Sequence, residues 1–190
     1  MVVTYYGILC FKIQSGDTVL AIEPFGKESG LTVPRFEAHA VIAETPHPNY
    51  PEDKVFNISG PGEYEFKGIY AKGIAVSPKN TIYVISWENM KIAHMGKFSE
   101  KELKSEIQEQ VGTPDILFIP VGGGDVIDEE KAVKIINQIE PRIVIPMCYK
   151  KPDEFLKEIG EKVTPEEKLT IKKKDLPNAE DTKVVVLKTP

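Results

Sequence analysis

The densest run of polar side chains in the sequence is Glu44-Thr45-Pro46-His47-Pro48-Asn49-Tyr50-Pro51, directly after the apolar segment 40–43. A proline-stiffened loop at the end of a strand can hold ligating side chains rigidly. Histidine is a strong ligand for a transition metal, whereas asparagine and tyrosine are weak ones. The loop therefore indicates one metal ligand at most, His47, and a hydrogen bond to the backbone is the commoner role for such a histidine.

Cys148 is the second reactive group, because a thiolate binds zinc well and is also a nucleophile. Paired with His47 or His94, it could form a nucleophile and its base. A free cysteine packed as a small hydrophobic side chain is the commoner case. The glycine run 122–124 lacks the Gly-Lys-Ser/Thr ending of a phosphate loop, and we interpret it as a turn.

Short apolar runs separated by Gly, Pro, Asn and Asp predict strands through the first half of the chain. The predicted strands are Val2–Tyr6, Cys10–Gln14, Thr18–Pro24, Ala40–Glu44, Val55–Ile58, Tyr64–Phe66, Ile69–Val76, Thr81–Trp87 and Lys91–Ala93. The polar loop at 44–51 therefore follows a strand directly, in a region built mostly of sheet.

The second half alternates helices and strands. Ser99 and Glu102 have the spacing of a capping box, ahead of a helix whose apolar stripe ends at Gly112. Asp128 is the predicted N-cap of a second helix, which Pro141 ends, and a third helix is predicted at Pro152–Ile159. Further strands are predicted at Ile116–Val121, Arg142–Met147, Leu169–Ile171 and Lys183–Leu187. We interpret Lys172-Lys173-Lys174 as a solvated strand end, and His39 as a surface residue.

Composition excludes several classes of protein. The chain has 190 residues, 41% of them hydrophobic, which is enough for a folded core. Its net charge of −5 and two cysteines argue against nucleic-acid binding, an anionic membrane partner and a disulfide framework. With no signal-like segment at the N-terminus, we expect a cytoplasmic protein.

Seven blocks in order resemble the metallo-β-lactamase superfamily, and within it the small lactonase-like Zn-dependent hydrolases. The resemblance covers about residues 2–150 and rests on Tyr6-Gly7-Ile8-Leu9-Cys10-Phe11, Ile22-Glu23-Pro24-Phe25, Thr45-Pro46-His47-Pro48-Asn49-Tyr50, Gly60-Pro61-Gly62-Glu63-Tyr64, His94-Met95-Gly96-Lys97, Ile119-Pro120-Val121-Gly122-Gly123 and Pro146-Met147-Cys148-Tyr149. It implies an α/β fold, a four-layer αββα sandwich, with the site at the joint edge of the two sheets. We expect a single domain over 1–190, in which 1–150 carries these blocks and 151–190 completes the fold with a helix and strands.

The resemblance also implies a ligand set, from which this chain departs. The family's loop has the form His-x-His-x-Asp-His and binds two zinc ions that activate a bridging water. Here the four positions are Thr45, His47, Asn49 and Tyr50. No histidine stands near 75–77, Lys97 replaces a bridging aspartate, and Cys148 replaces the last histidine. Ile8 and Glu23 replace a supporting histidine and aspartate, while His94 has a supporting rather than a ligating position.

These departures predict that the two-zinc site does not form, because a lysine ammonium repels a dication and asparagine lacks the charge of aspartate. We therefore expect a vestigial site with no catalytic residue, no metal ligand and no cofactor. It consists of Thr45, His47, Asn49, Tyr50, His94, Lys97 and Cys148. The expected role is non-catalytic, namely binding or regulation through a small anionic ligand near Lys97 or a protein partner.

The alternative is an active hydrolase of the lactone or phosphoester type, with one remodelled zinc site on His47 and Cys148. Its metal content would distinguish it from the first reading. A third reading is a structural subunit, which would form a defined oligomer.

Overall fold

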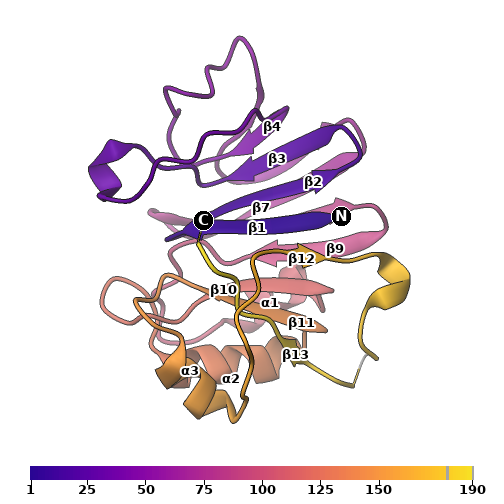
Figure 1. The fold of residues 1–190 in the computed structure, drawn as a ribbon. Helices are drawn as coiled ribbons and strands as arrows, with labels where there is room; N and C mark the ends of the chain where they lie inside the picture. The colour runs from indigo at the N-terminus through magenta and orange to yellow at the C-terminus, as the bar shows by residue number, and fades with distance from the viewer. Residues whose placement is uncertain (179, 190) are drawn as a thin grey trace.

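The computed structural model describes residues 1–178 and 180–189, and its strands form two sheets packed face to face (Figure 1). The first sheet has the strand order β12-β1-β2-β3-β4-β5. Its strands are β1 (Val2–Gly7), β2 (Cys10–Ser15), β3 (Thr18–Ile22), β4 (Ala40–Ile42), β5 (Phe56–Ile58) and β12 (Leu169–Thr170). Alternating buried and half-buried residues along β1 place one face against the core.

The second sheet has the order β13-β11-β10-β9-β8-β7-β6. Its strands are β6 (Gly62–Phe66), β7 (Ile69–Ser77), β8 (Asn80–Trp87), β9 (Met90–His94), β10 (Ile116–Pro120), β11 (Ile143–Met147) and β13 (Lys183–Val184). Every residue of β10 and β11 is buried, as expected for parallel strands covered on both faces.

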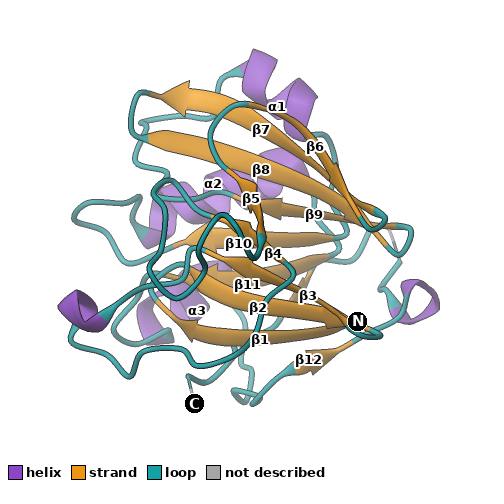
Figure 2. Ribbon diagram, turned by 90° about the horizontal axis from the view of Figure 1, so that it is seen from above, coloured by secondary structure: helices purple, strands orange, loops and turns teal. Residues whose placement is uncertain are grey.

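The three α-helices within 1–178 and 180–189 are α1 (Ser105–Val111), α2 (Glu129–Ile139) and α3 (Asp153–Ile159). α1 and α2 connect the parallel strands β9, β10 and β11, so right-handed crossovers place both on the outer face of the second sheet (Figure 2). The outer face of the first sheet is covered by connections instead, through Tyr50 and Phe36 packed on Val41. The mixed α/β two-sheet fold is thus confirmed, with loops in one of the outer layers.

The predicted start of the first α-helix is wrong. α1 begins at Ser105 with Lys104 as its N-cap, and no side chain caps it. Phe98 and Leu103 are both buried in the core, and the Phe98 carbonyl accepts a hydrogen bond from the Ile127 amide. These tertiary contacts hold the chain between Phe98 and Lys104 out of the helix, whereas the predicted cap at Asp128 is confirmed by its bond to the Lys131 amide.

One smaller expectation fails and another holds only in part. The lysine run is exposed, as expected, but it lies mostly in η2 (Lys173–Asp175), a 3-10 helix, and the Lys173 ammonium is ion-paired with Asp115. His39 is half-buried, and its Nδ1 accepts a hydrogen bond from the Val19 amide. In both cases a residue distant in sequence forms an ion pair or hydrogen bond with a polar side chain that we expected to face solvent.

Two sets of parallel strands present their carboxyl ends to the candidate site. β3, β4 and β5 are mutually parallel in the first sheet, and β9, β10 and β11 in the second. The turn between β1 and β2 joins the two edges, because the Cys148 amide donates to the Ile8 carbonyl at 3.0 Å. None of the helices in the described ranges is long and apolar enough to span a membrane.

Candidate functional site

Three residues at the joint edge of the sheets have left-handed backbone, although none is glycine. They are Ile8 with φ 54°, Glu23 with φ 44° and Cys148 with φ 56°. Ile8 lies in the β1–β2 turn, Glu23 follows β3, and Cys148 follows β11. Such backbone is unfavourable for residues with a Cβ and persists where surrounding contacts enforce it. The edge is therefore a place where tertiary structure overrides local preference.

Tyr5 supplies much of that constraint. Its hydroxyl donates to the Ile8 carbonyl at 3.0 Å and accepts from the Cys148 amide at 3.2 Å. The ring is buried, and burial raises the pKa of the phenol well above its usual range. Tyr5 thus remains a neutral link between the first strand of one sheet and the end of β11 in the other.

Glu23 is a half-buried carboxyl group at this edge. Its Oε1 accepts a hydrogen bond from the Glu44 amide at 3.2 Å. Burial, with a smaller effect of the neighbouring Glu44 carboxylate, raises the pKa of Glu23 to about 7, against the opposing effect of the Lys97 ammonium. Glu23 can therefore take up and release a proton near neutral pH, which is a property of acid–base groups.

The Lys97 ammonium is close enough to Cys148 to affect the pKa of its thiol, but the two side chains differ in exposure. Cys148 is half-buried, and Lys97 is exposed. Burial raises the pKa of the Cys148 thiol to about 11, while Lys97 opposes that rise. The thiol is accordingly protonated at neutral pH, which makes it a poor nucleophile and a poor ligand until it loses that proton.

His94 has both ring nitrogens engaged. Nδ1 accepts from the Gly96 amide at 3.2 Å, so the neutral ring carries its proton on Nε2, which lies 3.1 Å from the Leu9 carbonyl. The ring is fully buried, and this burial lowers the pKa of His94 to about 4. His94 therefore ties β9 to the β1–β2 turn and has no lone pair available for a metal or a thiol.

Only some of the expected site residues in the polar loop 44–51 contact one another. Tyr50 is buried, donates its hydroxyl to the Phe36 carbonyl at 2.9 Å, and packs its ring 5.5 Å from that of His47. Thr45 and Asn49 are exposed. The Asn49 amide donates to Nδ1 of His47, so the neutral His47 ring carries its proton on Nε2.

These residues do not fit a preformed zinc centre. Zinc sites in proteins use three or four nitrogen, sulfur or carboxylate ligands. Within residues 1–178 and 180–189 no three His, Cys, Asp or Glu side chains are grouped so that they could hold an ion. His47 would have to change its protonated nitrogen, and Cys148 would have to lose its proton. The arrangement assigns no ligand set, and we derive no reaction step through a metal.

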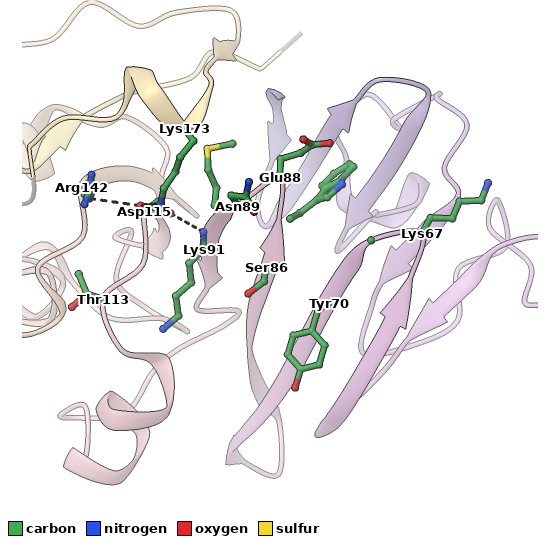
Figure 3. Close-up of a pocket in the computed structure, with 13 residues that line it drawn as sticks. Lys67, Tyr70, Ser86, Glu88, Asn89, Lys91, Thr113, Asp115, Arg142 and Lys173 are labelled. Carbon is green, nitrogen blue, oxygen red and sulfur yellow. Dashed lines mark hydrogen bonds and ion pairs between the residues drawn. The ribbon is translucent and has the colours of Figure 1, made fainter.

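A cavity of about 930 Å³ lies at the opposite end of the second sheet (Figure 3). At its base the buried Asp115 carboxylate accepts from the Lys91 amide at 2.8 Å and from the Lys173 ammonium at 2.8 Å, with Arg142 Nε at 3.6 Å. These contacts join η2 to the starts of β10 and β11. Because the Asp115 carboxylate is fully engaged in holding these segments together, we interpret the cluster as structural.

The family model for the beta-lactamase superfamily domain matches residues 2–148. The chain belongs to this superfamily. The match includes every strand of the joint edge from β1 to β11, and so confirms the resemblance and the fold expected from the sequence.

Curated relatives within the superfamily match over shorter stretches. A metal-dependent hydrolase of the UPF0173 group from Thermococcus onnurineus is 33% identical over 90 residues, 42% of this chain and 39% of that protein. Another from Pyrococcus furiosus is 32% identical over 90 residues, with the same coverage. The matched part thus spans well under half the length of these relatives.

Solved structures match over nearly the whole chain. A proposed Zn-dependent hydrolase of the metallo-beta-lactamase superfamily from Thermotoga maritima superposes with a TM-score of 0.80, at 26% identity, over 98% of both chains. Igni18, a metallo hydrolase from Ignicoccus hospitalis, has a TM-score of 0.65 at 17% identity, over 90% of this chain and 99% of its own. The second likeness concerns the fold alone.

The comparisons contradict two expectations from the sequence. The expected non-catalytic binding or regulatory role is wrong, because the matching relatives carry the name of metal-dependent hydrolases. The expected lack of a cofactor is wrong for the same reason, which the Thermotoga maritima structure reinforces. Both expectations rested on the replacement of the family's usual ligands in this chain.

Sequence reasoning missed two contributors to this edge. Tyr5 lies in a strand of alternating burial and looks like any core tyrosine, so nothing local marks its bonds to Ile8 and Cys148. Glu23 was assigned only a supporting position, yet a carboxyl group directly after the apolar run 19–22 is a signal for a half-buried acid. Its raised pKa depends on Glu44 and Lys97, which only the fold brings near.

Proposed function

We propose that this chain is a metal-dependent hydrolase of the lactone or phosphoester type, working with a single ion. The observation that carries the proposal is the likeness to a proposed Zn-dependent hydrolase over 98% of both chains. The names of the UPF0173 relatives support the same class. Of the expected ligand set this chain keeps His47, and Cys148, which replaces the last histidine of that set, is the second candidate donor. A bound ion would activate water or polarise the scissile bond.

Glu23 and Lys97 are the groups of this chain to which we assign chemistry in the proposal. With a pKa of about 7, Glu23 can accept a proton from the attacking water at its carboxylate and later return it to the leaving group. The Lys97 ammonium can stabilise negative charge that develops on the substrate oxygen. We assign both roles from the charges of the two groups and from the interaction between them.

Metal analysis combined with hydrolysis assays tests the proposal. We expect protein purified without chelator to contain about one zinc, iron or manganese ion per chain, and to hydrolyse γ-butyrolactone or bis(4-nitrophenyl) phosphate. EDTA treatment, His47→Ala and Cys148→Ala should each lower both metal content and rate, the rate by about 100-fold. His39→Gln is the matched control, because this histidine bonds to the Val19 amide in the first sheet. A metal-free protein with no hydrolysis of either compound would refute the proposal.

Glu23→Gln tests the proton-binding assignment separately. Because the folded-state pKa is raised to about 7 from 4.5, the neutral carboxyl favours folding at low pH, and this contribution is lost as pH rises through 7. Glutamine keeps the neutral form, so the stability of the variant relative to wild type should rise by about 2 kcal/mol between pH 5 and pH 8. Urea denaturation at both pH values measures it. In a Lys97→Met background this pH-dependent difference in stability should be larger, because Lys97 lowers the pKa of Glu23. A stability difference between Glu23→Gln and wild type that is the same at pH 5 and pH 8 would contradict the assignment.

We also propose that the protein is cytoplasmic. Cys10 and Cys148 are both free thiols, which suits a reducing compartment. Fractionation of the source cells would test the location.

A further inference from the structure

A second cavity, of about 880 Å³, lies beside His47. One wall is the connection between β3 and β4, which contains the short helix η1 (Lys27–Ser29) that projects at the left of Figure 1. This connection runs from residue 23 to 39, a length unusual for a segment with so little regular structure and typical of binding loops. The cavity therefore joins a candidate binding loop to the loop that carries His47.

Much of the cavity wall is apolar. Its apolar residues are Tyr6, Leu31, Val33, Pro34 and Pro48. Leu31 is 46% exposed, although it lies close to Gly7, where an added Cβ would be 3.0 Å from its Cδ1. An exposed leucine on a concave wall gains free energy when an apolar group covers it. The wall thus favours a ligand with an apolar body.

The polar groups of the cavity favour one negative charge. Arg35 and Lys27 line it, and neither forms an ion pair with another residue of the described ranges. Glu28 also lines it, but its carboxylate accepts a hydrogen bond from the Gly26 amide at 2.8 Å. With two cations and one anion, the lining has a net positive charge in a chain whose total is −5.

His47 adds an unsatisfied hydrogen-bond donor. Its Nε2 is buried and has no partner among the described residues. Since Nδ1 accepts from the Asn49 amide, Nε2 carries the proton. A buried donor without an acceptor is costly, but this atom is covered and is not open to a ligand in the cavity as the side chain stands.

We propose that this cavity binds an amphiphilic carboxylate, with the apolar body on the wall around Leu31 and the carboxylate facing Arg35. The inference deepens the proposed function by naming the kind of molecule bound beside His47. It rests on the proposed function only in assuming that the substrate binds in this cavity. Binding itself requires no metal ion and no turnover.

Isothermal titration calorimetry in the presence of EDTA tests the proposal with three probes. 4-Phenylbutyrate has both the apolar body and the charge, 4-phenylbutan-1-ol has only the body, and butyrate has only the charge. We expect 4-phenylbutyrate to bind at least about tenfold more tightly than either of the others. Equal affinities for the three probes, or no binding of 4-phenylbutyrate, would overturn the proposal.

Two variants test which residues of the cavity contact the ligand. Arg35→Gln and Leu31→Ser should each weaken 4-phenylbutyrate binding about tenfold, through loss of charge and of apolar surface respectively. Lys79→Gln, on the turn between β7 and β8, and Tyr70→Ser, in β7 on the second sheet, are the matched controls and should bind as wild type. Unchanged binding by Arg35→Gln would contradict the carboxylate contact. Because EDTA is present, this result is independent of the metal-dependent assays, so either proposal can fail alone.

Discussion

Gly122→Ala is expected to lower the free energy of unfolding by more than about 3 kcal/mol and to displace the segment that carries Cys148. Gly122 follows β10, and a Cβ added there would lie 1.8 Å from the Cys148 carbonyl oxygen. No side chain fits at that distance, so one of two backbone segments must move. The moving segment is anchored through the Cys148 amide to Tyr5 and Ile8, and those bonds should weaken with it.

Urea denaturation followed by circular dichroism measures this effect, and Gly124→Ala provides the matched control. Gly124 has φ 68° and no atom within 4 Å of an added Cβ, so alanine there should cost only the backbone strain, about 1 kcal/mol. The two variants differ in packing against Cys148 and not in the residue introduced. If Gly122→Ala were no less stable than Gly124→Ala, the close approach between Gly122 and the Cys148 segment would be disproved.

The stability difference between wild type and His94→Gln is expected to shrink by about 3 kcal/mol on acidification from pH 7 to pH 4. Burial lowers the folded-state pKa of His94 to about 4, against 6.5 for the free side chain. The neutral ring therefore contributes stability that is fully present above pH 6.5 and is lost as pH falls through 4. Glutamine does not titrate, so the variant lacks this dependence.

Denaturation curves of both proteins across this pH range give the measurement. Glu23 titrates in the same range with the opposite effect on stability, but it is common to both proteins and cancels in their difference. The ring signals of His94 in a nuclear magnetic resonance titration should also stay those of the neutral form until about pH 4. A stability difference that is the same at pH 7 and pH 4 would show that the ring is not kept neutral by burial.

The order of elements could be predicted from local pattern. Apolar runs broken by turn residues identified the strands from β1 to β11 to within a few residues, and Asp128 identified the start of α2. Strands and helices in alternation imply parallel strands joined by crossovers, and therefore a shared edge at their carboxyl ends. The polar loop with His47 follows β4 at that edge, so the place of the candidate site was also predictable from the sequence.

What the side chains do at the edge was decided by the tertiary structure. His94 bonds to Leu9, 85 residues away, and the Cys148 amide bonds to Tyr5, 143 residues away. Such contacts leave no trace in local periodicity, because they exist only once both sheets have packed. Tyr50 illustrates the same limit, since it stands where a ligand was expected but its hydroxyl is bound to Phe36 in a small core.

The chain by itself thus determined the two-sheet framework and the position of His47, because apolar spacing and turn residues act over a few neighbouring positions. The folded structure alone decided which groups at the edge titrate, which are held in hydrogen bonds, and which line a cavity. Burial and charge at Glu23, His94 and Cys148 come from residues remote in sequence, and burial is the largest cause of each of their pKa shifts.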